Sequence, residues 1–449
     1  MFKTKKYTAL EIAKIVGGRL FGKNIEIENV FTDTREEKIF NACFFALKGE
    51  NFDGTNYIDE AISRGATLVV AEEEVNVEAP VIYVNDTREA FLRLSANNIG
   101  KTKIIAITGS SGKTTVKEMV KSVLAQEYKV CATSANDNNE IGVAKTLFSI
   151  SDHDFCILEM GMRSRGEIGL LASIVKPYIS VITNIGLAHL GRLGSEDEIF
   201  NAKCELLPFT SKYAIVPCEE RFRKANFARA EPIFVGNDGK IKVDNVNYVD
   251  NKIRFNIVDQ IFDSSNEFEI QSPFFHDCKN FLIAYLIGRL LNVSVQKIQA
   301  EIFEFKNFKN RGNVFEIKGI TIIDDCYNCS YNGLKSSIAG LISYAKANNK
   351  IPCAVLGDML EIGIDSYKYH REIGEFARKS GVKKLFCKGE FSCAYCEGFE
   401  GGKRCSTTSE LVESIVNSLN GDEIILVKAS RGERFELVID EMKERLNGA

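Results

Sequence analysis

Short apolar runs alternate with amphipathic stretches along most of this chain. The pattern is clearest in the middle, where each apolar run is followed by a loop and a helical pattern; the runs are Ile104–Thr108, Phe155–Glu159, Ile179–Thr183 and Tyr213–Pro217. Buried strands that alternate with helices are typical of a parallel sheet covered on both faces. We therefore predict such a sheet in the middle of the chain.

The two ends of the chain predict further α/β units. Near the start, Thr8 can cap a helix that runs to Val16, and further elements are expected at 44–47, 66–71, 80–84 and 87–99. Residues 240–271 have an antiparallel pattern and precede a helix at 278–291. A polar, turn-forming segment at 305–313 leads to strands expected at 320–324, 353–356, 384–387 and 423–427. These shifts predict an α/β protein of three domains, at residues 1–99, 100–310 and 311–449.

Composition narrows the classes of protein. The 449 residues are 45% hydrophobic and 26% charged, which is ordinary for a globular protein, and the net charge of −4 argues against nucleic-acid binding. The first residues lack the apolar stretch of a signal peptide and no run reaches the length of a membrane span, so we expect a cytoplasmic protein with no membrane insertion. The 13 cysteines should then be reduced thiols. Two CxxC pairs, Cys326/Cys329 and Cys393/Cys396, leave a zinc site open, although their separation far exceeds the usual interval of about 15–20 residues.

Residues 104–116, IIAITGSSGKTTV, combine a strand pattern with a loop that can hold phosphate. Gly109 and Gly112 let backbone N–H groups face an anion, and the helix that follows adds its positive end. Lys113 supplies a charge for the β- and γ-phosphates, and Thr114 supplies a hydroxyl for Mg²⁺. The strict P-loop pattern requires glycine at position 107, where this chain has Ile107. The string predicts nucleotide chemistry with an unusually compact loop.

Three further strings place polar side chains where strands of the predicted sheet end. Glu159 can hold Mg²⁺ beside the threonine hydroxyl, although a solvated strand-end glutamate is the ordinary alternative. His189 follows another strand and can ligate a metal or have a structural role. Lys203 belongs to a helical stretch, where spacing alone favours a surface position. Loops at the carboxyl ends of parallel strands bind ligands, so we expect these residues near the phosphate loop.

In this order, the strings TGSSGKTT, EMG, TNIGLAHL and AKCEL resemble the central domain of the Mur ligase family, the ATP-dependent amide ligases of peptidoglycan assembly and their relatives. The resemblance implies that Thr114 and Glu159 bind one Mg²⁺ and that His189 binds a second. It also implies that Lys203 is carbamylated by CO₂, which converts a cation into a hard oxygen ligand for the second metal. Lys113, Glu159, His189 and Lys203 are therefore the expected catalytic residues.

The same resemblance assigns residues to the two nucleotide substrates. ATP is expected to contact Gly109, Ser110, Ser111, Gly112, Lys113, Thr114, Thr115, Asn280, Arg311 and Asp325. Asn138 and Asn139 match a family loop that approaches phosphates and substrate, although Ala144 stands where the family has proline. The strings TDTR, FFALKG and FDG resemble the family's UDP-binding domain, where Thr34 and Arg35 would approach the diphosphate. Thr55 and Asn41 depart from the usual histidine and glycine there.

Three strings near the end of the chain, IDDCYN, VLGDMLEIG and KASRG, resemble the family members that add D-alanyl-D-alanine to UDP-N-acetylmuramoyl-tripeptide. The acceptor is expected near Tyr327, Asn328, Asp358, Ser430 and Arg431. Cys329-Ser330-Tyr331 stands where the family has A-N-P, which could reshape the dipeptide pocket. The predicted reaction is amide formation through an acyl phosphate.

Several alternatives stay open from the sequence. The departures at Thr55, Ala144 and Cys329 leave room for a different acceptor amino acid or dipeptide. A P-loop kinase or NTPase, or a binding protein that has kept the fold, is a more distant alternative. The chain is expected to act as a monomer, and lysine or diaminopimelate can be the third residue of the tripeptide. His370 is expected on the surface of a helix.

Overall fold

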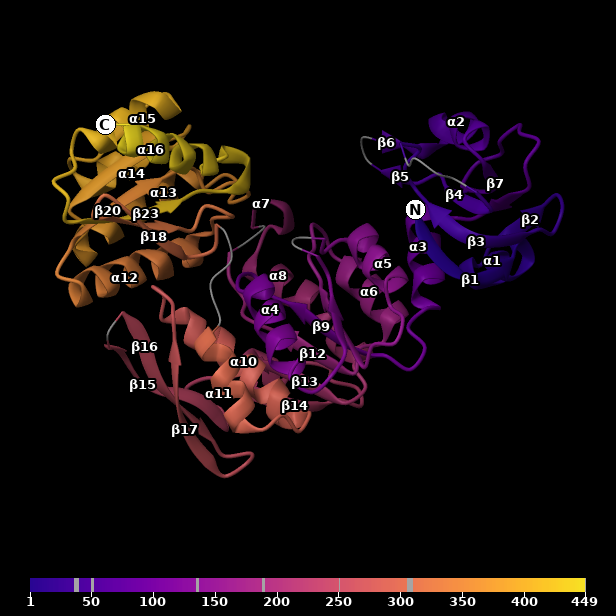
Figure 1. The fold of residues 1–449 in the computed structure, drawn as a ribbon, viewed down its shortest axis with the longest axis horizontal. Helices are drawn as coiled ribbons and strands as arrows, with labels where there is room; N and C mark the ends of the chain where they lie inside the picture. Colours follow the sequence, from indigo (N-terminus) through magenta and orange to yellow (C-terminus); the bar gives the residue numbers. More distant parts are fainter. Residues whose placement is uncertain are drawn as a thin grey trace.

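The computed structural model describes residues 1–35, 40–49, 52–134, 137–187, 190–249, 251–304 and 310–448. Three α/β units follow one another along the chain and form an arc, with the central unit between the two terminal ones (Figure 1). The three-unit α/β arrangement predicted from the apolar pattern is therefore present. The boundaries after residues 99 and 310 stay predictions.

The first unit is a six-stranded mixed sheet. Its strands lie in the order β1 (Phe2–Thr8), β3 (Glu26–Phe31), β4 (Ala42–Phe45), β7 (Ala66–Ala71), β8 (Val81–Tyr83) and β2 (Arg19–Phe21). The other elements are α1 (Ala9–Val16), α2 (Ile58–Ser63), α3 (Thr87–Ala96) and the short pair β5 (Lys48–Gly49) and β6 (Phe52–Asp53). Thr8 caps α1 in a capping box with Glu11, which confirms the predicted start of this helix.

The central unit is a nine-stranded sheet. Its order is β10 (Val130–Ala132), β11 (Phe155–Glu159), β9 (Lys103–Thr108), β12 (Ile179–Ile182), β13 (Tyr213–Pro217), β14 (Glu231–Val235), β15 (Ile241–Val249), β16 (Lys252–Asp259) and β17 (Ser264–Ile270). Pairing is parallel from β10 to β15 and antiparallel between β15, β16 and β17, as the sequence predicts. Its helices are α4 (Lys113–Leu124), α5 (Glu140–Phe148), α6 (Glu167–Val175), α7 (Leu190–Leu193), α8 (Glu196–Cys204), α9 (Glu220–Arg223), α10 (His276–Leu290) and α11 (Val295–Glu304).

Alternate residues of β9 are buried on opposite faces of the central sheet. Ile104 and Ala106 belong to the apolar core formed with α5 and α6, whereas Ile105 and Ile107 belong to the core formed with α4 and α10. A strand covered on both faces needs an unbroken apolar run, which β9 has. Ile107 is thus a fully buried strand residue that pairs with Glu159 of β11.

The third unit is a six-stranded sheet in the order β18 (Asn313–Ile317), β19 (Ile320–Asp324), β23 (Glu423–Lys428), β20 (Ile351–Leu356), β21 (Lys384–Lys388) and β22 (Lys403–Cys405). Its helices are α12 (Tyr331–Ala347), α13 (Ser366–Ser380), α14 (Ser392–Phe399), α15 (Thr408–Val416) and α16 (Glu436–Gly448). The sheet is parallel except at its β18 edge, which the sequence patterns did not indicate.

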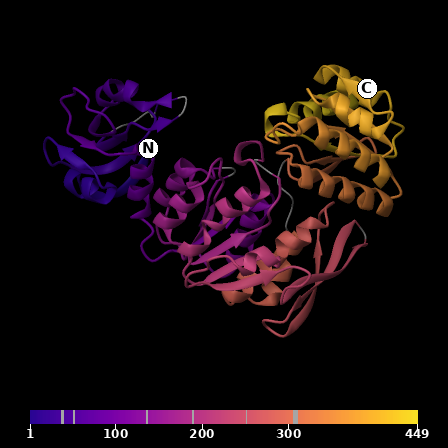
Figure 2. The same cartoon turned by 180° about the vertical axis from the view of Figure 1, so that it is seen from behind.

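Aromatic side chains join the central unit to both neighbours. Phe148 of α5 stacks on Phe2 of β1, with ring centroids 5.5 Å apart. On the other side, Phe274 is buried in the core of the third unit against Gly340 of α12, where an added Cβ would lie 2.5 Å from the phenyl ring. Seen from behind, the two terminal units remain on opposite sides of the central one (Figure 2).

Two further findings concern membranes and cysteines. In the part of the chain that the structure describes, no helix combines the length and apolar character of a membrane span. All 13 cysteines are free thiols, and no group of three or more His, Cys, Asp or Glu side chains in the described ranges could hold a metal ion. The two CxxC pairs therefore do not form the zinc site that the sequence left open.

Candidate active site

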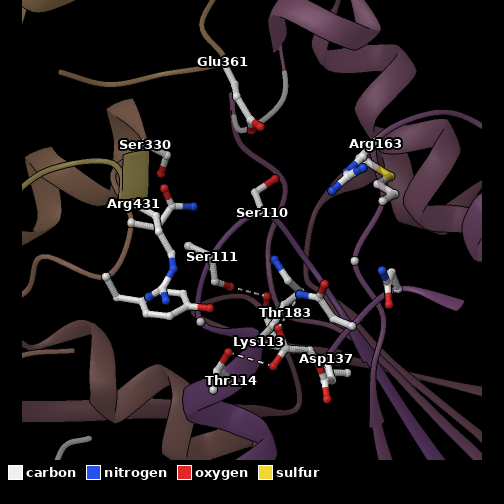
Figure 3. A pocket seen from close by; sticks show the side chains of 18 of the residues that line it. Ser110, Ser111, Lys113, Thr114, Asp137, Arg163, Thr183, Ser330, Glu361 and Arg431 are labelled. Carbon is white, nitrogen blue, oxygen red and sulfur yellow. Dashed lines mark hydrogen bonds between the residues drawn. The ribbon is translucent and has the colours of Figure 1, made fainter. Parts of the chain in front are cut away.

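A large cavity of about 1730 Å³ lies at the carboxyl ends of the central parallel strands. Residues of all three units line it, from Asp33 in the first, through the phosphate loop, to Arg431 in the third. All three units therefore wall the cavity, with the ends of the central strands at its floor. Figure 3 shows the phosphate loop of the central unit facing Ser330 and Arg431 of the third.

The phosphate loop is shaped by two glycines at its ends. Gly109 follows β9 with φ 151°, and a Cβ there would lie 1.9 Å from the hydroxyl of Thr183. Gly112 has φ 77° and is the N-cap of α4. Between them, the N–H of Ser111 donates to Oδ1 of Asn184 at 3.0 Å. The loop is thus held against the end of β12, and the start of α4 faces the cavity.

The departure at Ile107 has a simple structural reason. The compact loop begins after β9 ends, so position 107 lies inside a buried strand. An apolar side chain there fills the core, whereas a glycine would weaken the strand.

Lys113 is at the first position of α4. Its Nζ donates to the backbone oxygen of Gly109 at 2.9 Å, so the side chain folds back over the loop. Burial, with the nearby charge of Arg311, lowers the pKa of Lys113. An anion at the loop would offset both effects, which is the behaviour expected of a phosphate-binding lysine.

Thr114 and Glu159 meet at the floor of the cavity. The hydroxyl of Thr114 donates to Oε2 of Glu159 at 2.7 Å, and Nδ2 of Asn138 donates to Oε1 at 3.0 Å. Glu159 is 2% exposed, and its N–H donates to the hydroxyl of Thr133, which fixes the end of β11. A buried carboxylate beside a hydroxyl provides the hard oxygen ligands that Mg²⁺ prefers.

Lys203 of α8 is 2% exposed, so the surface position favoured by spacing alone is wrong. Burial, together with the positive charge of Lys113, lowers the pKa of Lys203 well below its usual range. Within the described ranges Lys203 makes no ion pair. His189, the other expected ligand of the second metal, lies outside the described residues.

Arg311 connects the segment before the third unit to the phosphate loop. Its Nη2 donates to the hydroxyl of Thr114 at 2.9 Å, and its guanidinium carbon lies 3.7 Å from the centre of the Tyr327 ring. Arg431 lies 5.2 Å from the same ring centre. Asp325, expected at the ribose, accepts from Nζ of Lys428 at 2.6 Å and lines the cavity.

Other expected substrate residues have defined partners. Oδ1 of Asn139 accepts from the N–H of Gly142 and caps α5, and Nδ2 of Asn280 donates to Oδ1 of Asp277 at 3.0 Å. Arg35 pairs with Asp33 at the rim of the first unit, and its guanidinium lowers the pKa of Asp33 to about 2. Thr34 is buried beside this pair.

Of the third-unit strings, VLGDMLEIG forms the loop Gly357–Gly363, which we call the acidic loop, and KASRG contacts it. Asp358 is buried and accepts from the N–H groups of Glu390 and Phe391. The hydroxyl of Ser430 accepts from the N–H of Leu360 at 2.8 Å. Tyr327, Asn328, Ser430 and Arg431 line the cavity, whereas Asp358 does not.

His370 is fully buried, so its expected surface position is wrong. Its Nε2 accepts from the N–H of Met359 at 2.9 Å, and its Nδ1 lies 2.6 Å from the oxygen of Ser366. A proton on Nδ1 satisfies both contacts. His370 therefore braces the acidic loop through its hydrogen bond with Met359.

The three residues that depart from the family's A-N-P pattern, Cys329, Ser330 and Tyr331, lie in two different environments. Cys329 and Ser330 line the cavity, but Tyr331 does not. The Tyr331 hydroxyl donates to Glu372 of α13 at 2.5 Å and its ring packs on Tyr369. Tyr331 thus begins α12 on the side facing α13.

Sequence reasoning missed Asn184, Lys428 and Glu361 as site residues. Each lies within a string that was recognised, TNIG, KASRG or VLGDMLEIG, and each contacts or lines the cavity. Their position within these recognised strings was the signal that could have identified them.

Comparisons with known proteins match this architecture. The Mur ligase middle domain matches residues 107–288, the Mur ligase glutamate ligase domain matches 310–431, and the Mur ligase family catalytic domain matches 32–106. The UDP-N-acetylmuramoyl-tripeptide–D-alanyl-D-alanine ligase of Haemophilus influenzae is 32% identical over 98% of this chain and 99% of its own. The enzyme of the same name from Synechocystis is 34% identical over 94% of this chain and 93% of its own. The crystal structure of MurF from Acinetobacter baumannii, 27% identical, has a TM-score of 0.90 and covers 98% of this chain and 99% of its own.

Proposed function

The chain belongs to the Mur ligase family, and we propose how its cavity makes an amide bond. It is an ATP-dependent ligase that adds D-alanyl-D-alanine to UDP-N-acetylmuramoyl-tripeptide in peptidoglycan precursor synthesis. The observation that carries this function is the alignment with a D-alanyl-D-alanine-adding relative, which spans nearly all of this chain and nearly all of the relative. A cavity walled by all three units suits a reaction with three substrates.

The reaction proceeds through an acyl phosphate. The terminal carboxylate of the tripeptide attacks the γ-phosphorus of ATP and ADP leaves; the acceptor nitrogen then attacks the acyl carbon and phosphate leaves. Lys113 and Arg311, which both reach the phosphate loop, offset the charge that gathers on the phosphoryl oxygens. Ser110, Ser111 and Thr115 contribute at the same loop, Asn280 at the adenine and Asp325 at the ribose. Closure of the three walls keeps water from the acyl phosphate.

The residues at the cavity floor fit magnesium. Thr114 and Glu159 would supply oxygen atoms for one ion, and His189 with a carbamate on Lys203 would hold a second. A bound Mg²⁺ withdraws charge from phosphate oxygens and orients them. The buried position and lowered pKa of Lys203 support the carbamate, since only a neutral amine attacks CO₂.

The two peptide substrates occupy opposite walls. Thr34 and Arg35 hold the UDP group at the first unit, and Asn138 and Asn139 guide the muramoyl peptide toward the phosphate loop. At the third unit, Tyr327, Asn328, Ser430 and Arg431 contact the dipeptide, while Asp358 acts by shaping the acidic loop. Since Tyr331 packs on α13, only Cys329 and Ser330 alter this wall relative to the family pattern.

The enzyme acts in the cytoplasm, where its nucleotide substrates are made, and as a monomer. Its negative net charge supports the absence of a nucleic-acid partner.

Product analysis tests this function. Purified protein is given UDP-muramoyl-tripeptide, ATP, Mg²⁺ and D-alanyl-D-alanine, and phosphate release and product mass are followed together. We expect one phosphate per UDP-muramoyl-pentapeptide, with the lysine and diaminopimelate tripeptides compared side by side. Lys113→Ala should release no phosphate and form no UDP-muramoyl-pentapeptide. Phosphate release without a new amide would favour an NTPase, and ligation of other acceptors in preference would replace the dipeptide assignment.

A further inference from the structure

The acidic loop holds a carboxylate at the cavity wall that the reaction scheme above does not use. Glu361 lines the cavity, and Figure 3 shows its carboxylate directed into it. Its charge also acts on Lys113 of the phosphate loop, although burial has the larger effect on the pKa of that lysine. Glu361 therefore faces the place where the acyl phosphate forms.

The backbone at Glu361 is held in an unusual conformation. Its φ of 70° lies in the left-handed region, which a non-glycine residue adopts where the surrounding structure holds it there. Two contacts impose it here. The oxygen of Glu361 accepts from the N–H of Gly191 in the central unit at 2.9 Å, and the preceding residue, Leu360, donates to Ser430.

The base of the acidic loop is equally fixed. Asp358 accepts from two backbone N–H groups, and His370 accepts from Met359. A loop pinned at four consecutive positions, from 358 to 361, places its one cavity-facing carboxylate at a defined point. Such preorganisation is typical of groups that act on reacting atoms.

The chemistry requires a group at this wall. The acceptor dipeptide has an α-ammonium with a pKa of about 8, so most of it is protonated at neutral pH. The nitrogen can attack only through its lone pair, and a positioned base commonly contributes about 100-fold to 10,000-fold to such a step.

Resting on the proposed function, we propose that Glu361 binds the α-ammonium of the acceptor dipeptide and takes one of its protons, which frees the lone pair that attacks the acyl carbon. The C–N bond forms as the bond between the acyl carbon and the phosphate oxygen breaks. Phosphate leaves with the electron pair and takes the second proton that the nitrogen loses, and the first proton passes from Glu361 to water. The third unit thus delivers the base together with the acceptor, and Glu361 is a catalytic residue of the second half-reaction.

Glu361→Gln separates the two half-reactions because it keeps shape and removes the charge. The acyl phosphate is trapped with hydroxylamine in the absence of acceptor, and amide product is measured from about pH 6.5 to 10. We expect hydroxamate formation within about twofold of the wild type. Amide formation should fall about 100-fold at neutral pH and recover toward the wild-type rate above pH 9, where the acceptor is already a free amine.

Glu375→Gln is the matched control, since Glu375 lies on α13 and pairs there with Arg371 and Lys379. It should change neither half-reaction. Unchanged amide formation by Glu361→Gln at every pH, or equal loss of hydroxamate and amide, would overturn the role of Glu361. Absence of hydroxamate and of pentapeptide with the wild type would instead contradict the proposed function, so the two failures are distinguishable.

Discussion

At the scale of single residues, Lys203 is the most unusual group in the cavity region. A long cationic side chain is 2% exposed, beside a second lysine, with no ion pair in the described ranges. An unpaired buried charge is costly, so the lysine is held there as a neutral amine or in modified form. Carbamylation removes the cation and adds oxygen ligands, which resolves the energetic problem and serves the metal site at once.

Lys203→Ala should therefore abolish ligation, by about 100-fold or more, and a small carboxylate such as acetate should partly restore it. A second measurement does not depend on activity. In ¹³C-bicarbonate, the ¹³C NMR spectrum of the wild-type protein should contain a carbamate signal that Lys203→Ala lacks. Lys212→Ala, on an exposed lysine before β13, is the control and should retain signal and activity. Full activity of Lys203→Ala without added carboxylate would exclude the carbamate.

At the scale of elements, the acidic loop depends on a histidine beneath it. His370 lies on α13, contacts the rings of Phe391 and Tyr395, and accepts from Met359. Burial is the largest cause of the lowered pKa of His370, from an ordinary value of 6.5. Below pH 6.5 the unfolded chain binds a proton that the folded chain resists. This contribution to stability is thus present above that pH and lost as the pH falls.

His370→Gln should lower the free energy of unfolding by about 1–3 kcal/mol at neutral pH, because glutamine loses the ring contacts with Phe391 and Tyr395 and its flexible side chain must be ordered to accept from Met359. It should also flatten the decline in stability between about pH 6.5 and 5. Denaturant unfolding of both proteins across this range measures both effects. His153→Gln, in a loop of the central unit, controls for the substitution. An unchanged free energy of unfolding in His370→Gln at neutral pH would contradict the bracing role, and an unchanged pH slope would contradict the lowered pKa of His370.

How far the sequence predicted the elements depended on how each is buried. β9 and β11 were found within a residue because strands covered on both faces require continuous apolar runs. β18 was missed because an antiparallel edge strand is half exposed and its pattern is weak. At the site, Lys113 and Glu159 follow from local strings. The burial of His370 and the position of Glu361 depend on contacts between distant segments, which periodicity does not record.

At the scale of the whole molecule, two of the contacts between the third unit and the central one differ in kind. Phe274 is buried against Gly340 near the start of α10, and Gly191 of α7 meets Gly363 of the acidic loop. The first contact is a large apolar anchor, whereas the second consists of backbone only. In a hinge motion of the third unit, we expect the apolar contact to persist and the backbone contact to open. The glycine contact then sets how closely Glu361 and Arg311 approach ATP.

Gly191→Ala tests this, because a Cβ there would lie 2.9 Å from the N atom of Gly363 and 3.1 Å from the oxygen of Glu361. The clash lies between units, so the chain relieves it by parting them rather than by unfolding. We expect unfolding free energy within about 1 kcal/mol of the wild type. Small-angle X-ray scattering should show a larger radius of gyration with bound nucleotide, and ligation should fall at least about tenfold. Gly169→Ala in α6, where the nearest atom is 3.4 Å away on Glu205, is the matched control. Equal scattering curves and equal rates for Gly191→Ala and wild type would show that the contact between Gly191 and Gly363 does not govern closure.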